Sequence, residues 1–212
     1  MTTTMIKPED VKRLREQTGA GVMDCKRALE ESGGDVEKAI TWLREKGLST
    51  AAQKAGRAAL EGVVTSYIHH GSRLGVLLEL NCETDFVART DDFHQLAREL
   101  AMAVAGHGPA YVSRDQVPGD VLEAQRRAFT LDAEQEGRPA DRVAAIVEGK
   151  LNKWLESACL MELPYRDTDR KIADLITEKI ALLKENIRVA RFARMAVGET
   201  SSGSAGAGPE AA

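Results

Sequence analysis

The central segment of the sequence is L-N-C-E-T-D-F-V-A-R, Leu80 to Arg89, because the pattern of the chain changes there from strand to helix. An apolar run of strand length, Leu74 to Leu80, precedes it, and a helical pattern begins after it at Asp91. Residues 84–86 are therefore predicted to lie on a strand-to-helix turn. A turn of this kind on a rigid scaffold often displays functional side chains.

The residues at this turn allow two interpretations. In the first, the carboxylate of Asp85 accepts hydrogen bonds from turn amides while Phe86 packs into the core. Phenylalanine is usually buried, so the residues alone favour this interpretation. In the second, Asp85 and Phe86 are presented together and enter a partner protein.

Two strands are predicted before the turn. Residues 62–69 alternate with the period of a strand, a turn follows at Gly71, and residues 74–80 return as a more buried strand of the same hairpin. His69 and His70 are expected to be exposed polar residues at the tip. They have no acidic or cysteine partner at metal-ligand spacing, so a metal site is not expected there.

A third strand and four helices complete the predicted core of residues 61–198. Arginine alternates with apolar residues from Asn186 to Val197, which suits a strand that joins the hairpin, because isolated hairpins are marginal. Apolar stripes predict helices over residues 91–106, 120–136, 139–158 and 172–183. The fold class is therefore α+β. The tail, residues 199–212, is rich in Ser, Gly and Ala and is expected to be disordered.

The N-terminal part, residues 1–48, is predicted to form a three-helix domain. Glycine turns separate its helices, Asp35 suits the N-cap of the third helix, and Gly47 is predicted to end that helix. Three helices in so short a segment make a marginal core. We therefore expect this domain to dock on a partner rather than to catalyse a reaction.

Residues 49–60 are predicted to form a helical linker between the two domains. The segment is rich in alanine and basic side chains. Lys54 and Arg57 could contact phosphate, but a solvated basic face is the favoured interpretation, because the net charge of the chain is -4.

The composition excludes several classes of protein. Aromatic residues make up only 4% of the chain, which argues against base stacking on single-stranded nucleic acid. The net charge of -4 argues against a binder of duplex DNA, so no direct contact with nucleic acid is expected. No apolar run approaches the roughly 18 residues of a membrane span, and the N-terminus lacks a signal-peptide core. A cytoplasmic protein without membrane contact is expected.

No pattern in the sequence indicates an enzyme or a cofactor. The phosphate-binding loop, the dinucleotide fingerprint and the nucleophile elbow are all missing. The three cysteines, Cys25, Cys82 and Cys159, show no C-x-x-C spacing, so neither a metal site nor a disulfide framework is expected. A single disulfide between two molecules remains an open alternative. Lys26, beside Cys25, could lower the pKa of that thiol.

Two stretches together resemble the bacterial translation elongation factor Ts family. L-R-E-Q-T-G-A-G-V-M-D-C-K-R-A-L, Leu14 to Leu29, is similar to the family's N-terminal signature, and N-C-E-T-D-F-V-A-R, Asn81 to Arg89, resembles its core signature. The likeness continues through residues 66–77, 147–151 and 191–199. The resemblance implies a three-helix domain of ubiquitin-associated type, followed by an α+β core with antiparallel strands.

The resemblance also implies a function. Members of this family are guanine-nucleotide exchange factors for elongation factor Tu, and they are not enzymes in the bond-making sense. Carried over, Phe86 is expected to wedge between side chains of the partner's switch region near its magnesium site. Asp85 is expected to lie beside it and help displace the magnesium-binding arrangement, with Thr84 and Val87 in the same contact. The resemblance therefore favours the presented interpretation of Phe86.

Further partner contacts are implied outside this turn. The N-terminal domain is expected to dock on the GTPase domain through Met23, Asp24, Cys25 and Lys26, with Lys26 as the basic residue at a contact position. His70 corresponds to another contact position in the family.

The resemblance is to the short, single-core form of the family. Long members carry an internal duplication of the core and a coiled-coil insertion, whereas short members pair two copies of the chain. A homodimer is therefore expected, through the strand of residues 186–197. The segment P-Y-R-D-T-D, Pro164 to Asp169, departs from a more apolar family stretch that touches the partner.

Two other functions remain open alternatives. The three-helix domain could hold another protein as an interaction module without nucleotide exchange. The chain could also be an RNA-associated translation protein that uses Lys54, Arg57 and the arginines of the last strand, although its acidic balance argues against this.

Overall fold

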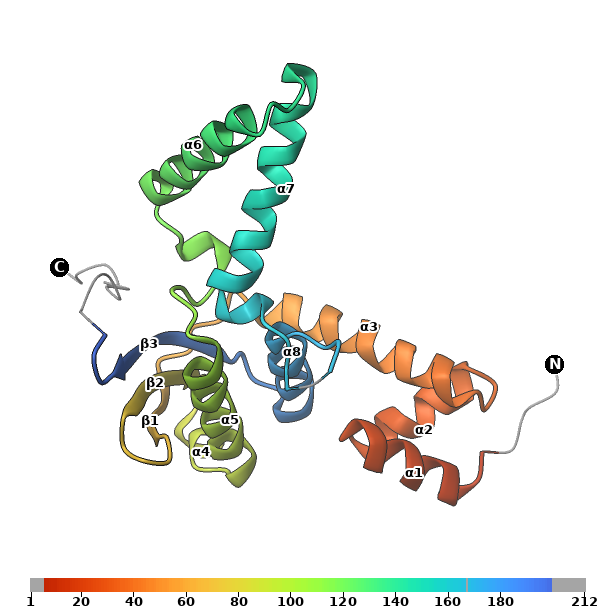
Figure 1. Cartoon of the computed structure of the whole chain (residues 1–212). Coiled ribbons are helices and arrows are strands. Elements are labelled where there is room, and N and C mark those ends of the chain that lie inside the picture. Colours follow the sequence, from red (N-terminus) through yellow and green to blue (C-terminus); the bar gives the residue numbers. More distant parts are fainter. Residues whose placement is uncertain (1–5, 167, 200–212) are drawn as a thin grey trace. The chain divides into compact units, whose positions relative to one another are not determined.

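The computed structural model describes residues 6–166 and 168–199 (Figure 1). These residues form eight α-helices, two short 3-10 helices and one three-stranded antiparallel sheet. The predicted α+β class is confirmed. The predicted disordered tail lies outside the described residues from residue 200 onward.

The chain divides into two compact units that each draw on distant parts of the sequence. The first consists of Met1–Gly62, Asn81–Phe93 and Asp174–Arg188. The second consists of Val63–Leu80, His94–Ala173 and Val189–Ala212. The division inferred from the sequence, with boundaries at residues 48, 60 and 198, stays a prediction.

Three N-terminal helices belong to the first unit, as predicted: α1 (Pro8–Thr18), α2 (Val22–Glu31) and α3 (Val36–Lys54). The carboxylate of Asp35 accepts a hydrogen bond from the amide of Lys38 at 3.1 Å, which caps the start of α3. The three helices enclose a small apolar core whose fully buried members are Leu14, Cys25, Ala28, Leu29 and Ala39.

The third helix does not end at Gly47, so that prediction is wrong. Gly47 is buried within α3, which continues to Lys54. A Cβ placed at Gly47 would lie 3.8 Å from side-chain atoms of Thr177 and Ala181, both on α8 (Ile172–Leu183). Gly47 therefore lies where α3 packs on α8 and does not end the helix.

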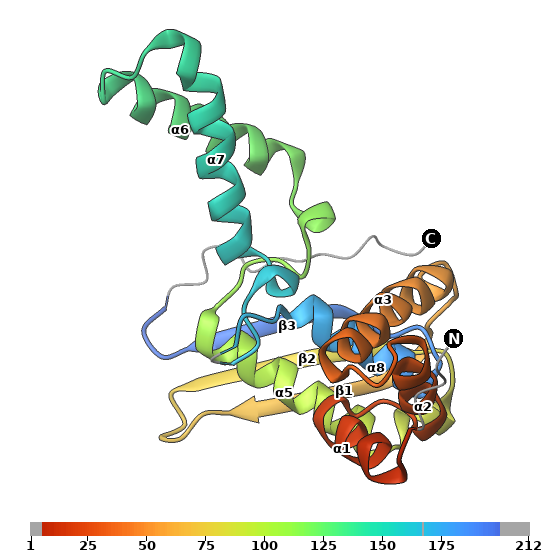
Figure 2. The ribbon, with the colours of Figure 1, turned by 90° about the vertical axis from the view of Figure 1, so that its right-hand side faces the viewer.

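The sheet lies mainly in the second unit. Its strands β1 (Glu61–Ile68), β2 (Leu74–Cys82) and β3 (Arg188–Ala196) are arranged in the order β1-β2-β3. Both the hairpin and the third strand are confirmed. The three strands run side by side in Figure 2.

The two faces of the sheet differ in exposure. Leu78 of β2 is buried on one face, where α5 (Asp91–His107) packs and the Nε of Arg194 donates to the carbonyl of Ala105 at 3.5 Å. The other face carries exposed apolar side chains and the ion pair between Glu79 and Arg191, with 2.8 Å between Oε2 and Nε. We call this the open sheet face; its large exposed apolar residues are Val64, Ile68, Leu77 and Met195.

A helical hairpin completes the second unit. α6 (Gly119–Gln135) and α7 (Ala140–Ala158) lie side by side, joined by a turn in which Gly137 has a φ of 66° (Figures 1 and 2). Their shared apolar cluster has Val117, Leu151, Leu155 and Cys159 as its buried members. The 3-10 helices Arg114–Gln116 and Leu160–Glu162 flank this hairpin.

Candidate partner-binding site

The core signature forms a short helical projection after β2, which we call the finger and define as residues 84–87. Its helix, α4, spans only Asp85–Ala88. Thr84 is the N-cap, and its Oγ1 accepts a hydrogen bond from the amide of Val87 at 3.4 Å. The predicted strand-to-helix turn is therefore present, and a threonine at the N-cap starts the helix.

The finger presents Phe86 to solvent. The residue is 78% exposed, whereas Val87 beside it is only 5% exposed, so the expectation that the Val87 side chain contacts the partner is wrong. The interpretation in which Phe86 packs into the core is wrong, because Val87 and Ala88 turn inward on α4 and Phe86 points away from them. Asp85 is also exposed, and it forms a surface ion pair in which its Oδ2 lies 2.8 Å from Nη2 of Arg89.

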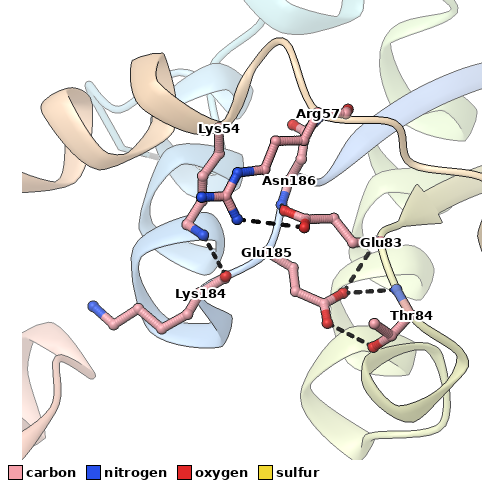
Figure 3. A network of polar contacts seen from close by, with 7 residues as sticks. All are labelled: Lys54, Arg57, Glu83, Thr84, Lys184, Glu185 and Asn186. Atoms are coloured by element: carbon pink, nitrogen blue, oxygen red, sulfur yellow. Dashed lines mark hydrogen bonds and ion pairs between the residues drawn. The ribbon is translucent and has the colours of Figure 1, made fainter.

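A carboxylate from a distant part of the sequence fixes the base of the finger (Figure 3). Oε2 of Glu185 accepts hydrogen bonds from the backbone amides of Glu83 and Thr84, each at 3.0 Å. Its Oε1 accepts a third hydrogen bond from the Thr84 hydroxyl at 2.5 Å. All of these residues belong to the first unit.

Lys54 and Arg57, the basic residues of the predicted linker, contact the two segments that meet at the base of the finger. Lys54 is only 9% exposed, and its Nζ donates to the carbonyl of Lys184 at 2.5 Å. Arg57 pairs with Glu83 at 3.5 Å. The interpretation of Lys54 as part of a solvated basic face is wrong, because α3 carries it into contact with the end of α8.

Glu83 forms a second carboxylate contact in this region. Its Oε1 accepts a hydrogen bond from the backbone amide of Asn186 at 2.6 Å. That bond, with the nearby Arg57 guanidinium, lowers the pKa of Glu83 below its ordinary value. Sequence reasoning missed the contacts of Glu83, Glu185 and Asn186, because about a hundred residues separate the two segments. Glu83 lies within the core signature, but the segment of Glu185 and Asn186 shows no motif that would link it to this signature.

The predicted contact residues of α2 fall into an exposed and a buried set. Met23 is 73% exposed, and Lys26 is exposed and pairs with Glu30 at 3.7 Å. Asp24 accepts a hydrogen bond from Lys46 at 2.5 Å and lies 3.5 Å from Nζ of Lys184, and the Lys46 bond is the main cause that lowers its pKa. An open pocket here is lined by Met23, Asp24, Lys26, Arg27, Glu30, Glu31 and Lys46.

Cys25 cannot contact a partner through its side chain. It is fully buried, and its thiol contacts the Thr18 hydroxyl at 3.9 Å and the Ala20 carbonyl at 3.6 Å. Burial raises the pKa of the Cys25 thiol, which contradicts the expectation that Lys26 lowers it. Cys25 is a core residue because α2 turns it away from Met23 and Lys26.

His70 belongs to the second unit, whereas the finger belongs to the first. It is exposed in the turn between β1 and β2, as expected for a polar tip residue. The neighbouring His69 Nδ1 lies 3.0 Å from the Tyr67 hydroxyl.

The described residues show no cluster of three or more His, Cys, Asp or Glu side chains arranged to hold a metal ion. Among the helices of residues 6–166 and 168–199, none is both long and apolar enough to cross a membrane.

Comparison with known proteins agrees with the resemblance seen in the sequence. A family model described as Elongation factor TS matches residues 30–199. Elongation factor Ts of Carboxydothermus hydrogenoformans is 55% identical over 196 residues, which cover 92% of this chain and 90% of that protein. Elongation factor Ts of Moorella thermoacetica is 54% identical over 196 residues, which cover 92% of this chain and 97% of that protein.

These matches place the chain among the bacterial translation elongation factors. It belongs to the elongation factor Ts family.

Proposed function

We propose that the protein is a guanine-nucleotide exchange factor that promotes GDP release from elongation factor Tu in the cytoplasm. The observation that carries this proposal is the 78% exposure of Phe86 within the core signature of the family. A large apolar side chain held away from its own core on a capped turn is available to enter a partner. Asp85 and Thr84 lie beside it on the same turn.

The exchange follows from thermodynamic linkage. A factor that binds the nucleotide-free GTPase more tightly than the GDP-bound form must weaken GDP binding by the same factor. Each tenfold weakening corresponds to about 1.4 kcal/mol. Full burial of a phenylalanine side chain contributes roughly 1.5–3 kcal/mol, so burial of Phe86 in the nucleotide-free complex alone would weaken GDP binding about ten- to hundredfold.

The finger residues have distinct roles in this mechanism. Phe86 inserts between side chains of the partner's switch region and moves them apart. The carboxylate of Asp85 enters beside it and disturbs the magnesium coordination that helps hold the phosphates of GDP. Val87 anchors the finger in its own core, while Met23, Asp24 and Lys26 on α2 and His70 on the hairpin supply further contact with the partner.

The test is release of a fluorescent GDP analogue from elongation factor Tu under catalytic amounts of this protein. The double variant Asp85→Ala/Phe86→Ala should slow release at least about tenfold, because the wedge is lost. The matched control is Leu60→Ala, which truncates an apolar residue of the same unit that is 82% exposed. Parental rates for the double variant would exclude the finger mechanism.

The same assay separates exchange from simple binding. The exposed Met23 and the open pocket on α2 also fit a module that binds a protein without promoting exchange. Capture of elongation factor Tu with no acceleration of GDP release would favour that alternative.

We also propose that two copies of the chain associate through the open sheet face. Val64, Ile68, Leu77 and Met195 are between 54% and 77% exposed, and they share this face across all three strands. Exposed apolar patches that span several elements commonly mark protein interfaces. This surface includes β3, the strand expected to pair the two copies.

The dimer is tested by sedimentation equilibrium. Leu77→Glu places a charge at the centre of the open sheet face and should shift the protein to monomer. Leu131→Glu on α6 is the control, because Leu131 is 58% exposed in the same unit but lies outside the sheet. A monomeric parent protein, or a Leu77→Glu variant that associates as the parent does, would contradict the proposal.

A further inference from the structure

We infer that Glu185 is a positioning residue for nucleotide exchange, which holds the finger in the orientation that the partner meets. The inference rests on the proposed function, because it concerns how the finger of the exchange factor is held. Glu185 lies in the segment after α8, where it reaches residues 83 and 84 at the base of the finger but not the finger tip.

The geometry of the Glu185 carboxylate favours this role. Its two oxygens accept three hydrogen bonds, two from consecutive backbone amides and one from the Thr84 hydroxyl. Hydrogen bonds to a charged acceptor are about twice as strong as neutral ones. Three of them within two residues restrict the direction in which the chain leaves β2 and enters α4.

Glu83, at the base of the finger, makes a reciprocal contact with the segment that carries Glu185. Its Oε1 accepts the amide of Asn186, so each segment supplies one carboxylate to backbone amides of the other (Figure 3). The side chain of Asn186 also donates to the carbonyl of Arg57 at 2.8 Å, and Asn186 is only 5% exposed. Reciprocal contacts of this kind limit rotation as well as separation of the two segments.

The finger needs such support because α4 is too short to be stable alone. A helix of four residues lies far below the roughly 12–15 residues at which isolated helices become even marginally stable. Thr84 caps its first turn through Oγ1, and the same hydroxyl donates to Glu185. The orientation of Phe86 therefore depends on Thr84, and the orientation of Thr84 depends on Glu185.

The same segment also reaches the contact surface on α2. Lys184 accepts a hydrogen bond from Lys54 through its carbonyl, and its Nζ lies 3.5 Å from Asp24. Residues 184 and 185 thus touch both the α2 surface and the base of the finger within the first unit. This placement suits a residue that fixes the position of the finger relative to the α2 surface, the two elements proposed to contact the partner.

The test compares Glu185→Ala, Glu185→Gln and a control in the fluorescent-GDP assay, at a temperature where each variant is folded by circular dichroism. Glu185→Ala should lower kcat of exchange about tenfold or more, because a small misplacement of a functional side chain can lower a rate by up to about a hundredfold. KM for the GDP-bound partner should change less than about threefold, because the α2 surface still binds. Glu185→Gln keeps one acceptor oxygen and should recover part of the loss.

The control is Asp174→Ala, which removes the hydrogen bond to Arg44 at 3.3 Å in the same unit without touching the finger. Asp174→Ala should lower thermal stability but keep kcat. Equal losses of kcat for Asp174→Ala and Glu185→Ala would show that Glu185 acts only through stability and would overturn the inference.

A combined variant separates failure of this inference from failure of the proposed function. If Glu185 acts through the finger, Glu185→Ala should have no further effect in the Asp85→Ala/Phe86→Ala background. An equal additional loss in that background would overturn the positioning role. Parental exchange by Asp85→Ala/Phe86→Ala would instead reject the finger mechanism itself, and parental kcat for Glu185→Ala with a slow finger variant would reject only the positioning role.

Discussion

Gly47 of α3 faces Ala181 of α8, and a Cβ at Gly47 would lie 3.8 Å from the Cβ of Ala181. That distance is an ordinary van der Waals contact, so the space admits one methyl group but not a larger side chain. The position therefore discriminates sharply between small and large residues.

Gly47→Ala is expected to stabilise the protein by up to about 1 kcal/mol, because alanine favours the helix interior over glycine. Gly47→Leu is expected to destabilise it by roughly 1–3 kcal/mol, because the extra atoms must push α3 away from α8. Urea unfolding of both variants gives the two values. Equal stability of the two would show that the helices are not in close contact here.

The three thiols are expected to be unreactive in the native protein. Cys25, Cys82 and Cys159 are buried, and burial raises the pKa of each thiol, that of Cys82 to about 11. A thiol reagent at about pH 8 should therefore react with them only after unfolding, since the thiolate is the nucleophile. One fast-reacting thiol in the native protein, or a cross-linked dimer on a non-reducing gel, would contradict this.

Acid is expected to weaken the contact between Glu83 and Asn186. The hydrogen bond from the Asn186 amide lowers the pKa of Glu83 below the ordinary value of 4.5 in the folded protein. The unfolded chain then binds more protons, so the stabilisation is present above that value and is lost as the pH falls through the lower folded pKa. Urea unfolding between about pH 7 and pH 3 should show this loss.

Glu83→Gln provides the matched variant for the acid experiment. Glutamine does not titrate, so the free energy of unfolding of this variant should depend less steeply on pH below 4.5 than that of the parent. The same slope in both proteins would mean that Glu83 does not contribute to the acid sensitivity.

Thr84 is expected to tolerate serine but not valine. Its hydroxyl accepts from the amide of Val87 and donates to Glu185. Thr84→Ser keeps both hydrogen bonds, whereas Thr84→Val removes both and should cost roughly 0.5–2 kcal/mol, the range measured for lost N-caps. Thermal unfolding gives the values, and amide hydrogen exchange at Val87 should quicken only in Thr84→Val.

Much of the fold follows from periodicity and capping. Apolar alternation predicts the hairpin and β3, three-to-four spacing predicts the helices, and Asp35 predicts the start of α3 correctly. The exposure of Phe86 did not follow from residue type, since phenylalanine is usually buried; the family resemblance indicated it.

The parts that sequence reasoning missed depend on contacts between distant segments. Gly47 has the local pattern of a helix end, yet its close neighbours lie about 130 residues away on α8. Lys54 sits in a basic, alanine-rich stretch and is nevertheless buried against the carbonyl of Lys184. A local pattern reports the residues beside it in the chain, whereas these partners become neighbours only once the chain has folded.

The strand order β1-β2-β3 leaves β3 at a border of the sheet, and this strand carries Arg188, Arg191 and Arg194. Backbone groups along such a border can pair with a further strand, and charged side chains on a border strand disfavour that pairing. Arg188 is exposed, whereas Arg191 and Arg194 form ion pairs with Glu79 and Glu199. The charged side chains along this border therefore disfavour sideways growth of the sheet, while its apolar surface stays available for association.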